Sequence, residues 1–189
     1  MATFALARRY PRESQFRDRP VTFRLMGAED KELFKNFIRS LPREDNFHLM
    51  LDVFNDPAID DWMKGVASGH TISVIALEKD QVIGYCNIHR SELPWIRHVG
   101  EIRMGVSRAF RGLGMGKALA TEAFAIAREC GLQKIWARMP ASQEAAQNVF
   151  SSLHFRAEAL LSDFVMNENG RTEDLVIMTY DAGKSWGGL

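Results

Sequence analysis

The chain has 189 residues, of which 46% are hydrophobic and 25% charged, with 24 Lys and Arg against 24 Asp and Glu. This length suits a single domain that buries its core without a disulfide or a metal staple. The net charge of zero argues against a general polyanion binder, because such proteins carry a clustered basic excess. We therefore expect no nucleic-acid partner, whereas a small charged ligand at a local basic patch remains compatible with the composition.

The cysteines and the apolar runs favour a cytoplasmic protein. Cys86 and Cys130 stand apart in the sequence and form neither a disulfide framework nor a CxxC motif, and we expect no bound metal. No apolar run reaches the ~18 residues of a membrane span, so no membrane partner is expected. Residues 1–20 are rich in arginine, but the arginines follow the apolar stretch, unlike in a secretory signal. We predict a polar N-terminal arm here, with a mitochondrial presequence as the alternative.

The first third of the chain predicts one strand and two or three helices. Residues 21–25 alternate enough for a short strand, and apolar residues at helical spacing predict a helix over 27–41, which Pro42 stops. Residues 43–55 are ambiguous and offer a second short helix. Another helix is expected over 57–67, where Pro57 suits the first turn.

From residue 71 onward the apolar period changes from 3.6 to 2, which predicts an antiparallel meander over 71–77, 81–89 and 98–106. A glycine-rich turn and an amphipathic helix that ends at Gly131 follow. The remaining pattern predicts a strand, a helix and two strands over 134–139, 142–153, 155–161 and 175–180. The order indicates one α+β domain over residues 21–181 with a short tail over 182–189.

The most informative segment is the turn Arg111-Gly112-Leu113-Gly114-Met115-Gly116, which lies between a strand and a helix. Glycines let the backbone turn sharply and approach a ligand closely. The first N–H groups of a helix have no intrahelical partner and carry partial positive charge, so this turn predicts a phosphate or pyrophosphate site. Arg111 and Lys117 would add charge to it.

Spacing excludes two other phosphate motifs. A P-loop needs GxxxxGK[ST], but Arg111 occupies the first glycine position and Ala118 follows Lys117. A dinucleotide fingerprint fails as well, because Lys117 falls at its last position when the motif is started at Gly112.

The pattern that fits is Arg-x-x-Gly-x-Gly at Arg111, Gly114 and Gly116, which resembles the coenzyme A pyrophosphate loop of the GNAT superfamily of N-acetyltransferases. The segment GEIRMGVSRAFRGLGMGKALATEAFAIAREC is similar to the central strand, loop and helix of that family, and the elements before and after it agree from residue 21 to 180. The resemblance implies the GNAT acyl-CoA N-acyltransferase fold, with a mixed, mostly antiparallel sheet of about seven strands flanked by helices on both faces.

The resemblance also implies the activity, which is direct transfer of an acetyl group from acetyl-CoA to a primary amine of a small molecule, peptide or protein. The backbone of Met104, Gly105 and Val106 would pair with the pantetheine arm. The amides of residues 111–116, together with Lys117, would hold the pyrophosphate, and Ser142 would bond to a cofactor amide. Homodimers are frequent in the family, so a homodimer is a further expectation.

Glu101 is the leading candidate for the general base, because it lies on the central strand where family members often place a carboxylate. An ammonium group with a pKa near 10 must lose a proton before it can attack. The alternative is that Glu101 only forms an ion pair with Arg103 or with a neighbouring strand. His98 and His89 are further alternatives for the base.

The second family helix departs from the usual pattern at one catalytic position. The family commonly has a tyrosine where this chain has Phe150, so the usual acid for the leaving thiolate is missing. Tyr180 and Tyr85 are the candidates to replace it, and water is another proton source. The missing hydroxyl also supports an alternative function, an acyl-CoA-binding regulatory protein with little or no turnover.

The acceptor is not identified by the sequence. The region of the N-terminal helices carries several aspartates beside aromatic residues, a composition that suits a cationic amine. Ordinary solvated helix charges around core aromatics are the alternative. The residues concerned are Asp45, Asp52, Asp56, Asp60, Asp61, Phe47, Phe54 and Trp62.

Overall fold

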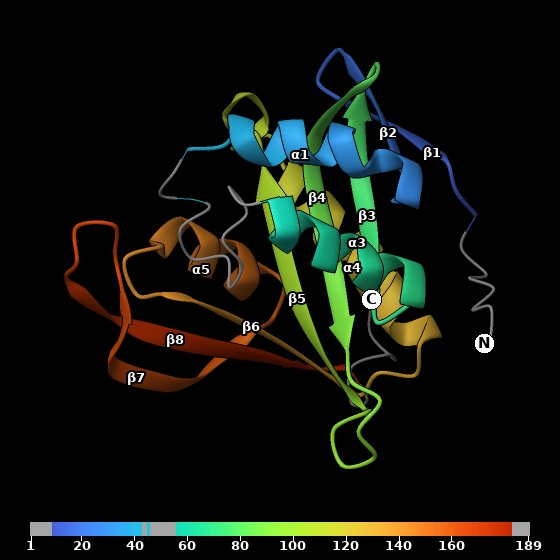
Figure 1. Cartoon of the computed structure of the whole chain (residues 1–189). Helices are drawn as coiled ribbons and strands as arrows, with labels where there is room; N and C mark the ends of the chain where they lie inside the picture. The colour runs from blue at the N-terminus through green and yellow to red at the C-terminus, as the bar shows by residue number, and fades with distance from the viewer. Residues whose placement is uncertain (1–8, 43–44, 46–55, 183–189) are drawn as a thin grey trace.

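The computed structural model describes residues 9–42, 45 and 56–182. In this part of the chain, eight strands form one sheet in the order β1-β2-β3-β4-β5-β6-β8-β7 (Figure 1). Neighbouring strands are antiparallel except β5 and β6, which are parallel. The strands are β1 (Arg12–Phe16), β2 (Arg19–Leu25), β3 (Thr71–Glu78), β4 (Gln81–Arg90), β5 (Val99–Val106), β6 (Lys134–Pro140), β7 (Arg156–Met166) and β8 (Thr172–Asp181).

Helices cover both faces of the sheet. On one face lie α1 (Lys31–Ser40) and α3 (Asp56–Ser68), on the other α4 (Met115–Glu129), and α5 (Glu144–Ser152) follows β6 (Figure 1). Two short 3-10 helices span Ala28–Asp30 and Arg108–Phe110. Among the described residues, no helix has both the length and the apolar character needed to cross a membrane.

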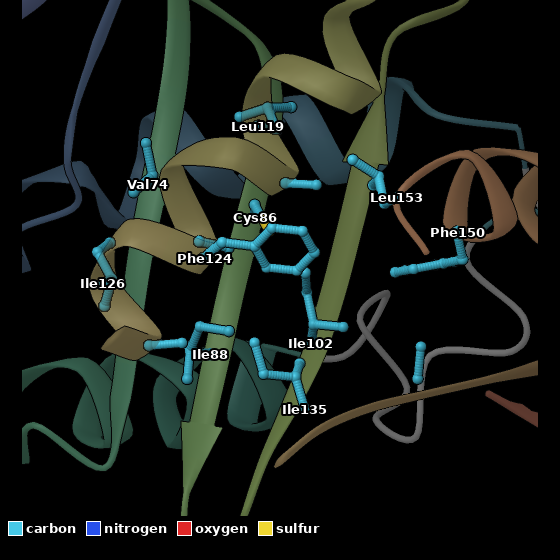
Figure 2. Close-up of a cluster of buried hydrophobic side chains, with 14 of the residues drawn as sticks. Val74, Cys86, Ile88, Ile102, Leu119, Phe124, Ile126, Ile135, Phe150 and Leu153 are labelled. Atoms are coloured by element: carbon cyan, nitrogen blue, oxygen red, sulfur yellow. The ribbon is translucent and has the colours of Figure 1, made fainter. Parts of the chain in front are cut away.

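The alternation of side chains along β3 and β4 produces two cores, one on each side of the sheet. Ile75 and Tyr85 pack with the apolar residues of α1 and α3. Val74 and Cys86 point to the other face, where they pack with the apolar face of α4 (Figure 2). Burial on both faces is why these central strands are almost continuously apolar.

The predicted α+β fold is confirmed, with one strand added to the sheet. The strand β1 lies within residues 1–20, which we expected to be a polar arm, and it pairs with β2. Its sequence RESQF has four exposed residues and no apolar alternation, so the pattern gave no sign of it. The sheet therefore has eight strands instead of about seven, and β7 and β8 are longer than expected. The expected helix in residues 43–55 and the tail 183–189 lie outside the described residues.

A buried carboxylate ties the N-terminal hairpin to α4. The Glu122 side chain is only 7% exposed, in the middle of the helix. It accepts hydrogen bonds from the Tyr10 hydroxyl at 2.9 Å and from Nη1 of Arg12 at 2.7 Å. A buried charge is tolerated when it is paired and hydrogen-bonded, so these two contacts explain why a glutamate occupies a core position of the helix.

We predict that Glu122→Gln lowers the free energy of unfolding by about 1–3 kcal/mol, because charge-assisted hydrogen bonds become neutral ones in a buried site. Urea unfolding at pH 7 measures the effect. The control is Glu168→Gln, which changes the same group on the exposed turn between β7 and β8 and should be neutral within about 0.5 kcal/mol. Equal stability of the two variants would contradict a role for Glu122 in holding the hairpin.

Candidate active site

The parallel strands β5 and β6 pair over only three positions. Val99 pairs with Lys134, Gly100 with Ile135, and Glu101 with Trp136. Beyond Glu101 the two strands diverge, and a cleft of about 490 Å³ opens between them. Its lining comes from both strands, the loop before α4 and the first turns of α5. It includes Ile102, Arg103, Met104, Gly105, Val106, Arg111, Gly112, Gly116, Arg138, Ser142 and Val149.

One end of this cleft is the N-terminus of α4. Gly114 is the N-cap residue with φ of 86°, and Gly112 also has a positive φ of 70°. These left-handed conformations favour glycine, which explains the spacing of the loop. A Cβ on Gly116 would touch Val149 and Met104 at 3.7 and 4.0 Å, so the helix starts close against β5 and α5. The free N–H groups of the first turn make this end suited to an anion.

The structure brings together most of the residues that we predicted to bind the cofactor. Seven of them line the cleft: Met104, Gly105, Val106, Arg111, Gly112, Gly116 and Ser142. Leu113, Gly114, Met115 and Lys117 are not among the lining residues. The side chain of Met115 is fully buried in the core, and Lys117 is exposed. Of these four, Gly114 is the N-cap and Met115 the first residue of α4.

Two of the predicted ligand groups already have protein partners. The Arg111 guanidinium forms an ion pair with Asp45, and its Nε donates to the carbonyl oxygen of Val106 at 3.1 Å. The Ser142 hydroxyl donates to Glu173 at 2.5 Å. A phosphate group that binds Arg111 must therefore compete with Asp45.

Glu101 lies at the point where β5 and β6 separate, and its carboxylate accepts hydrogen bonds from two arginines. Oε1 accepts from Nε of Arg103 at 2.9 Å and from Nε of Arg138 at 3.1 Å. Burial raises the pKa of Glu101, but the hydrogen bond from Arg103 and the charges of both arginines outweigh it. The pKa therefore lies below its usual range, and the carboxylate is ionised at neutral pH. The predicted pairing with Arg103 is present, and it does not remove Glu101 from the lining of the cleft.

The other candidate bases are less well placed. His98 is exposed in the turn before β5. His89 lies opposite Glu101 on β4, and its Nδ1 is 2.9 Å from the hydroxyl of Thr71. Burial and the charge of Arg103 lower the pKa of His89 to about 4, so its imidazole is neutral at pH 7. Neither histidine lines the cleft.

The two candidate tyrosines lie in different places. Tyr180 is 3% exposed and stacks on Phe124 and Phe155, with ring centroids at 5.0 and 5.7 Å. This stack is in the core beneath α4, so the structure does not bring Tyr180 to the cleft. Tyr85 does line the cleft, and a Cβ on Gly105 would come within 2.6 Å of its ring. Gly105 therefore leaves the room that the Tyr85 ring occupies.

Phe150 also lines the cleft, at the position where the family's tyrosine is expected. Its ring is buried and packs edge to face on Phe155 at 4.9 Å. Burial raises the pKa of Tyr85 well above its usual value, so its hydroxyl stays protonated at neutral pH. Among the described residues that line the cleft, Tyr85 is the one tyrosine and therefore the one phenol that could donate a proton there.

The aspartates that suggested an acidic rim are paired with basic side chains. Asp56 bonds to Lys35 at 2.9 Å and to Arg39 at 2.8 Å. Asp60 and Asp61 bond to Lys31 at 2.5 Å and to Lys64 at 2.6 Å. The ordinary interpretation, solvated helix charges, therefore accounts for these three. Asp52, Phe47 and Phe54 lie outside the described residues, and Trp62 is a core residue.

Arg138 is the residue of this site that the sequence analysis missed. It is on β6, two residues after the partner of Glu101, and so points to the same face as Glu101. The alternation in KIWARM could have predicted this orientation, because Trp136 and Arg138 are the less buried, alternate positions of the strand. Among the described residues, no three His, Cys, Asp or Glu side chains come together as a metal site.

The comparisons with known proteins agree with this geometry. The family model of the acetyltransferase (GNAT) family matches residues 31–155. Among curated proteins, none matches the sequence. Many solved structures share the fold. An acetyltransferase of the GNAT family from Streptococcus pneumoniae aligns with a TM-score of 0.73 and 18% identity, over 85% of this chain and 99% of that one.

Two other solved structures are of more specifically described acetyltransferases. A structure of yncA, a putative acetyltransferase from Salmonella typhimurium with its cofactor acetyl-CoA, aligns with a TM-score of 0.69 and 21% identity, over 86% and 94% of the chains. A chimera built from the spermidine N-acetyltransferase of Vibrio cholerae aligns with a TM-score of 0.71 and 17% identity, over 87% and 96%. The family match covers most of the chain, and its range includes the diverging strands and the glycine loop. The chain therefore belongs to the GNAT family and is an acetyl-CoA-dependent N-acetyltransferase.

Proposed function

We propose that the enzyme transfers the acetyl group directly to a primary amine of a small molecule or peptide. In this proposal Glu101 attracts the ammonium group and accepts its proton. The observation that carries this proposal is the position of Glu101. It lies at the last paired position of β5 and β6, and it lines the same cleft as the glycine loop. The anion-binding end and the carboxylate therefore open into one continuous space.

The residues present fit acetyl-CoA. Along residues 102–105, β5 pairs with β4 on one side and has no β6 partner on the other, so the backbone groups on that side suit the amides of a pantetheine arm. The N-terminus of α4 and Arg111 suit the pyrophosphate. When bound, acetyl-CoA supplies the activated acetyl group as a thioester.

The role of Glu101 follows from its charge and its surroundings. An ionised carboxylate attracts the incoming ammonium and accepts its proton, directly or through water. The amine nitrogen then forms the new N–C bond as the C–S bond of the thioester breaks. Because the pKa of Glu101 is lowered, the carboxylate passes the proton on to solvent and returns to its ionised form. The cysteines have no part in this scheme, and no acyl-enzyme forms.

The leaving thiolate must take up a proton, and Phe150 cannot donate one. Tyr85 replaces it in our proposal, because it lines the cleft and its hydroxyl carries a proton at neutral pH. Solvent that enters the cleft is the other source. Turnover then depends on positioning as well as on acid catalysis, since holding two reactants in the reactive geometry supplies much of the rate.

We predict that Gly114→Glu weakens coenzyme A binding at least tenfold, because it places a carboxylate beside the pyrophosphate at the helix N-terminus. Isothermal titration calorimetry measures the affinity. Gly131→Glu is the matched control, since Gly131 also has a positive φ of 69° but lies at the other end of α4. Unchanged affinity in Gly114→Glu would overturn the assignment of this loop to the coenzyme.

We predict that Glu101→Gln lowers kcat/KM about 10²- to 10⁴-fold at pH 7, the usual contribution of general acid–base catalysis. Thiol release from acetyl-CoA across a panel of amines measures the rate. Because the pKa of Glu101 is lowered, the fall in rate caused by protonation of Glu101 should occur at a lower pH than for an ordinary glutamate. Above pH 6 the wild-type rate should therefore rise only through deprotonation of the amine.

The control is Glu32→Gln, an exposed glutamate on α1 whose change should leave the rate within twofold. If Glu101→Gln keeps both the wild-type rate and the wild-type pH profile, Glu101 has no part in the mechanism. Tight coenzyme binding without thiol release on any amine would support a binding protein instead of an enzyme.

A further inference from the structure

The side chains around Glu101 carry an unusual arrangement of positive charge. Arg103 and Arg138 both donate to the same oxygen of Glu101, and both do so through Nε, the nitrogen closest to the chain. All three side chains line the cleft, and they are 18%, 26% and 12% exposed. Two guanidinium groups thus share one carboxylate oxygen in a partly buried place, where charges act more strongly than in water.

None of the described residues forms a hydrogen bond or ion pair with the forked Nη end of Arg103. Among the described residues, Arg103 makes no hydrogen bond or ion pair except the one from Nε to Glu101. A guanidinium group presents two parallel N–H groups at its end, and this fork matches the two oxygens of a carboxylate. The Nη end of Arg103 is therefore available on the lining of the cleft.

The strand beside Arg103 adds polar groups without adding negative charge. Asn87 lies opposite Arg103 on β4, and His89 lies opposite Glu101. Asn87 is fully buried, and neither its amide nitrogen nor its amide oxygen has a partner among the described residues. Neither residue lines the cleft, and neither brings a negative charge that would offset the charge of the arginines.

These contacts distinguish among classes of amine. A polyamine such as spermidine carries only positive charges and would meet the guanidinium groups of Arg103 and Arg138 beside Glu101, the carboxylate that receives it. In an amine that carries a carboxylate one or two carbons away, the positive and the negative group lie close together. Glu101 and Arg103 are a similarly close pair of opposite charges, since Nε of Arg103 lies 2.9 Å from Oε1 of Glu101. The ammonium of such an amine then faces Glu101 and its carboxylate faces the fork of Arg103.

We propose that the acceptor is an amine that also carries a carboxylate, of the amino-acid type, and that Arg103 binds this carboxylate through the forked end of its guanidinium. The inference rests on the proposed function, since it assigns a substrate class to the same cleft. Arg138 adds positive charge and holds Glu101 in place from the side of β6. Arg103 is then a specificity-determining residue as well as a partner of Glu101.

The first experiment compares each acceptor with its own uncharged analogue. Thiol release from acetyl-CoA is measured with the protein amino acids and β-alanine, with the carboxamide of each, and with spermidine. We expect the best amino acid to exceed its carboxamide in kcat/KM by at least tenfold, the usual effect of one charge-assisted hydrogen-bonded contact. Equal or faster reaction of the carboxamide or of spermidine would overturn the inference and leave the proposed function intact.

Variants of Arg103 separate recognition of the carboxylate from support of Glu101. Arg103→Gln should raise KM for the amino acid at least tenfold while changing KM for its carboxamide much less, and Arg103→Lys should fall between the two. The matched control is Arg156→Gln, an exposed arginine on β7 outside the lining of the cleft, which should keep the wild-type preference. Equal losses on both acceptors in Arg103→Gln would show that Arg103 only positions Glu101.

A binding measurement makes the inference independent of turnover. Calorimetry with coenzyme A-saturated protein compares N-acetylalanine with N-acetylalaninamide, and we expect the carboxylate form to bind at least tenfold more tightly. If no acceptor releases thiol but this preference is present, the proposed turnover fails and carboxylate recognition stands. If the preference is absent as well, both the proposed function and this inference fail.

Discussion

The early separation of β5 and β6 is the constraint on which the active site depends. A parallel pair normally satisfies the backbone groups of both strands along its length, but here pairing ends after Glu101 and Trp136. The two strands still remain part of one sheet, because β5 pairs with β4 up to Val106 and β6 pairs with β8 up to Pro140. Backbone hydrogen-bonding groups thus face each other across a cleft inside the sheet. A ligand with amide groups of its own, such as pantetheine, suits this arrangement.

The core on the α4 side explains why the loop at the end of β5 is held in position. Met115 and Leu119 of α4 are fully buried, and Gly84 of β4 lets the helix approach the sheet closely. A Cβ on Gly84 would come within 2.9 Å of Leu119 and 3.1 Å of the Gly105 carbonyl oxygen. The N-terminal part of α4 is therefore packed closely against β4 and β5. A rigid helix start supports precise placement of the pyrophosphate and, through it, of the reactive end of the coenzyme.

Local pattern was sufficient for most of the fold and for the loop, because periodicity and glycine spacing reflect nearby residues. It failed where the decisive contact joins distant segments. The polar strand β1 is specified by its pairing with β2 and by the contact of Arg12 with Glu122, which is 110 residues away. Tyr180 suited the sequence argument, but the stacking on Phe124 and Phe155 places it in the core. Arg138 reaches Glu101 across the β5–β6 pair, and parallel register cannot be derived from either strand alone.

The same ion pair that weakens Glu101 as a base also helps to explain how it can act at neutral pH. A buried carboxylate without partners would hold a proton and could neither attract nor deprotonate an ammonium group. Arg103 and Arg138 keep Glu101 ionised, and the resulting weak base suits a site in which the amine is positioned rather than strongly activated. An acceptor carboxylate on Arg103 would draw positive charge away from Glu101 and raise its pKa. A substrate of this class would therefore strengthen the base by binding, and an amine without the carboxylate would not.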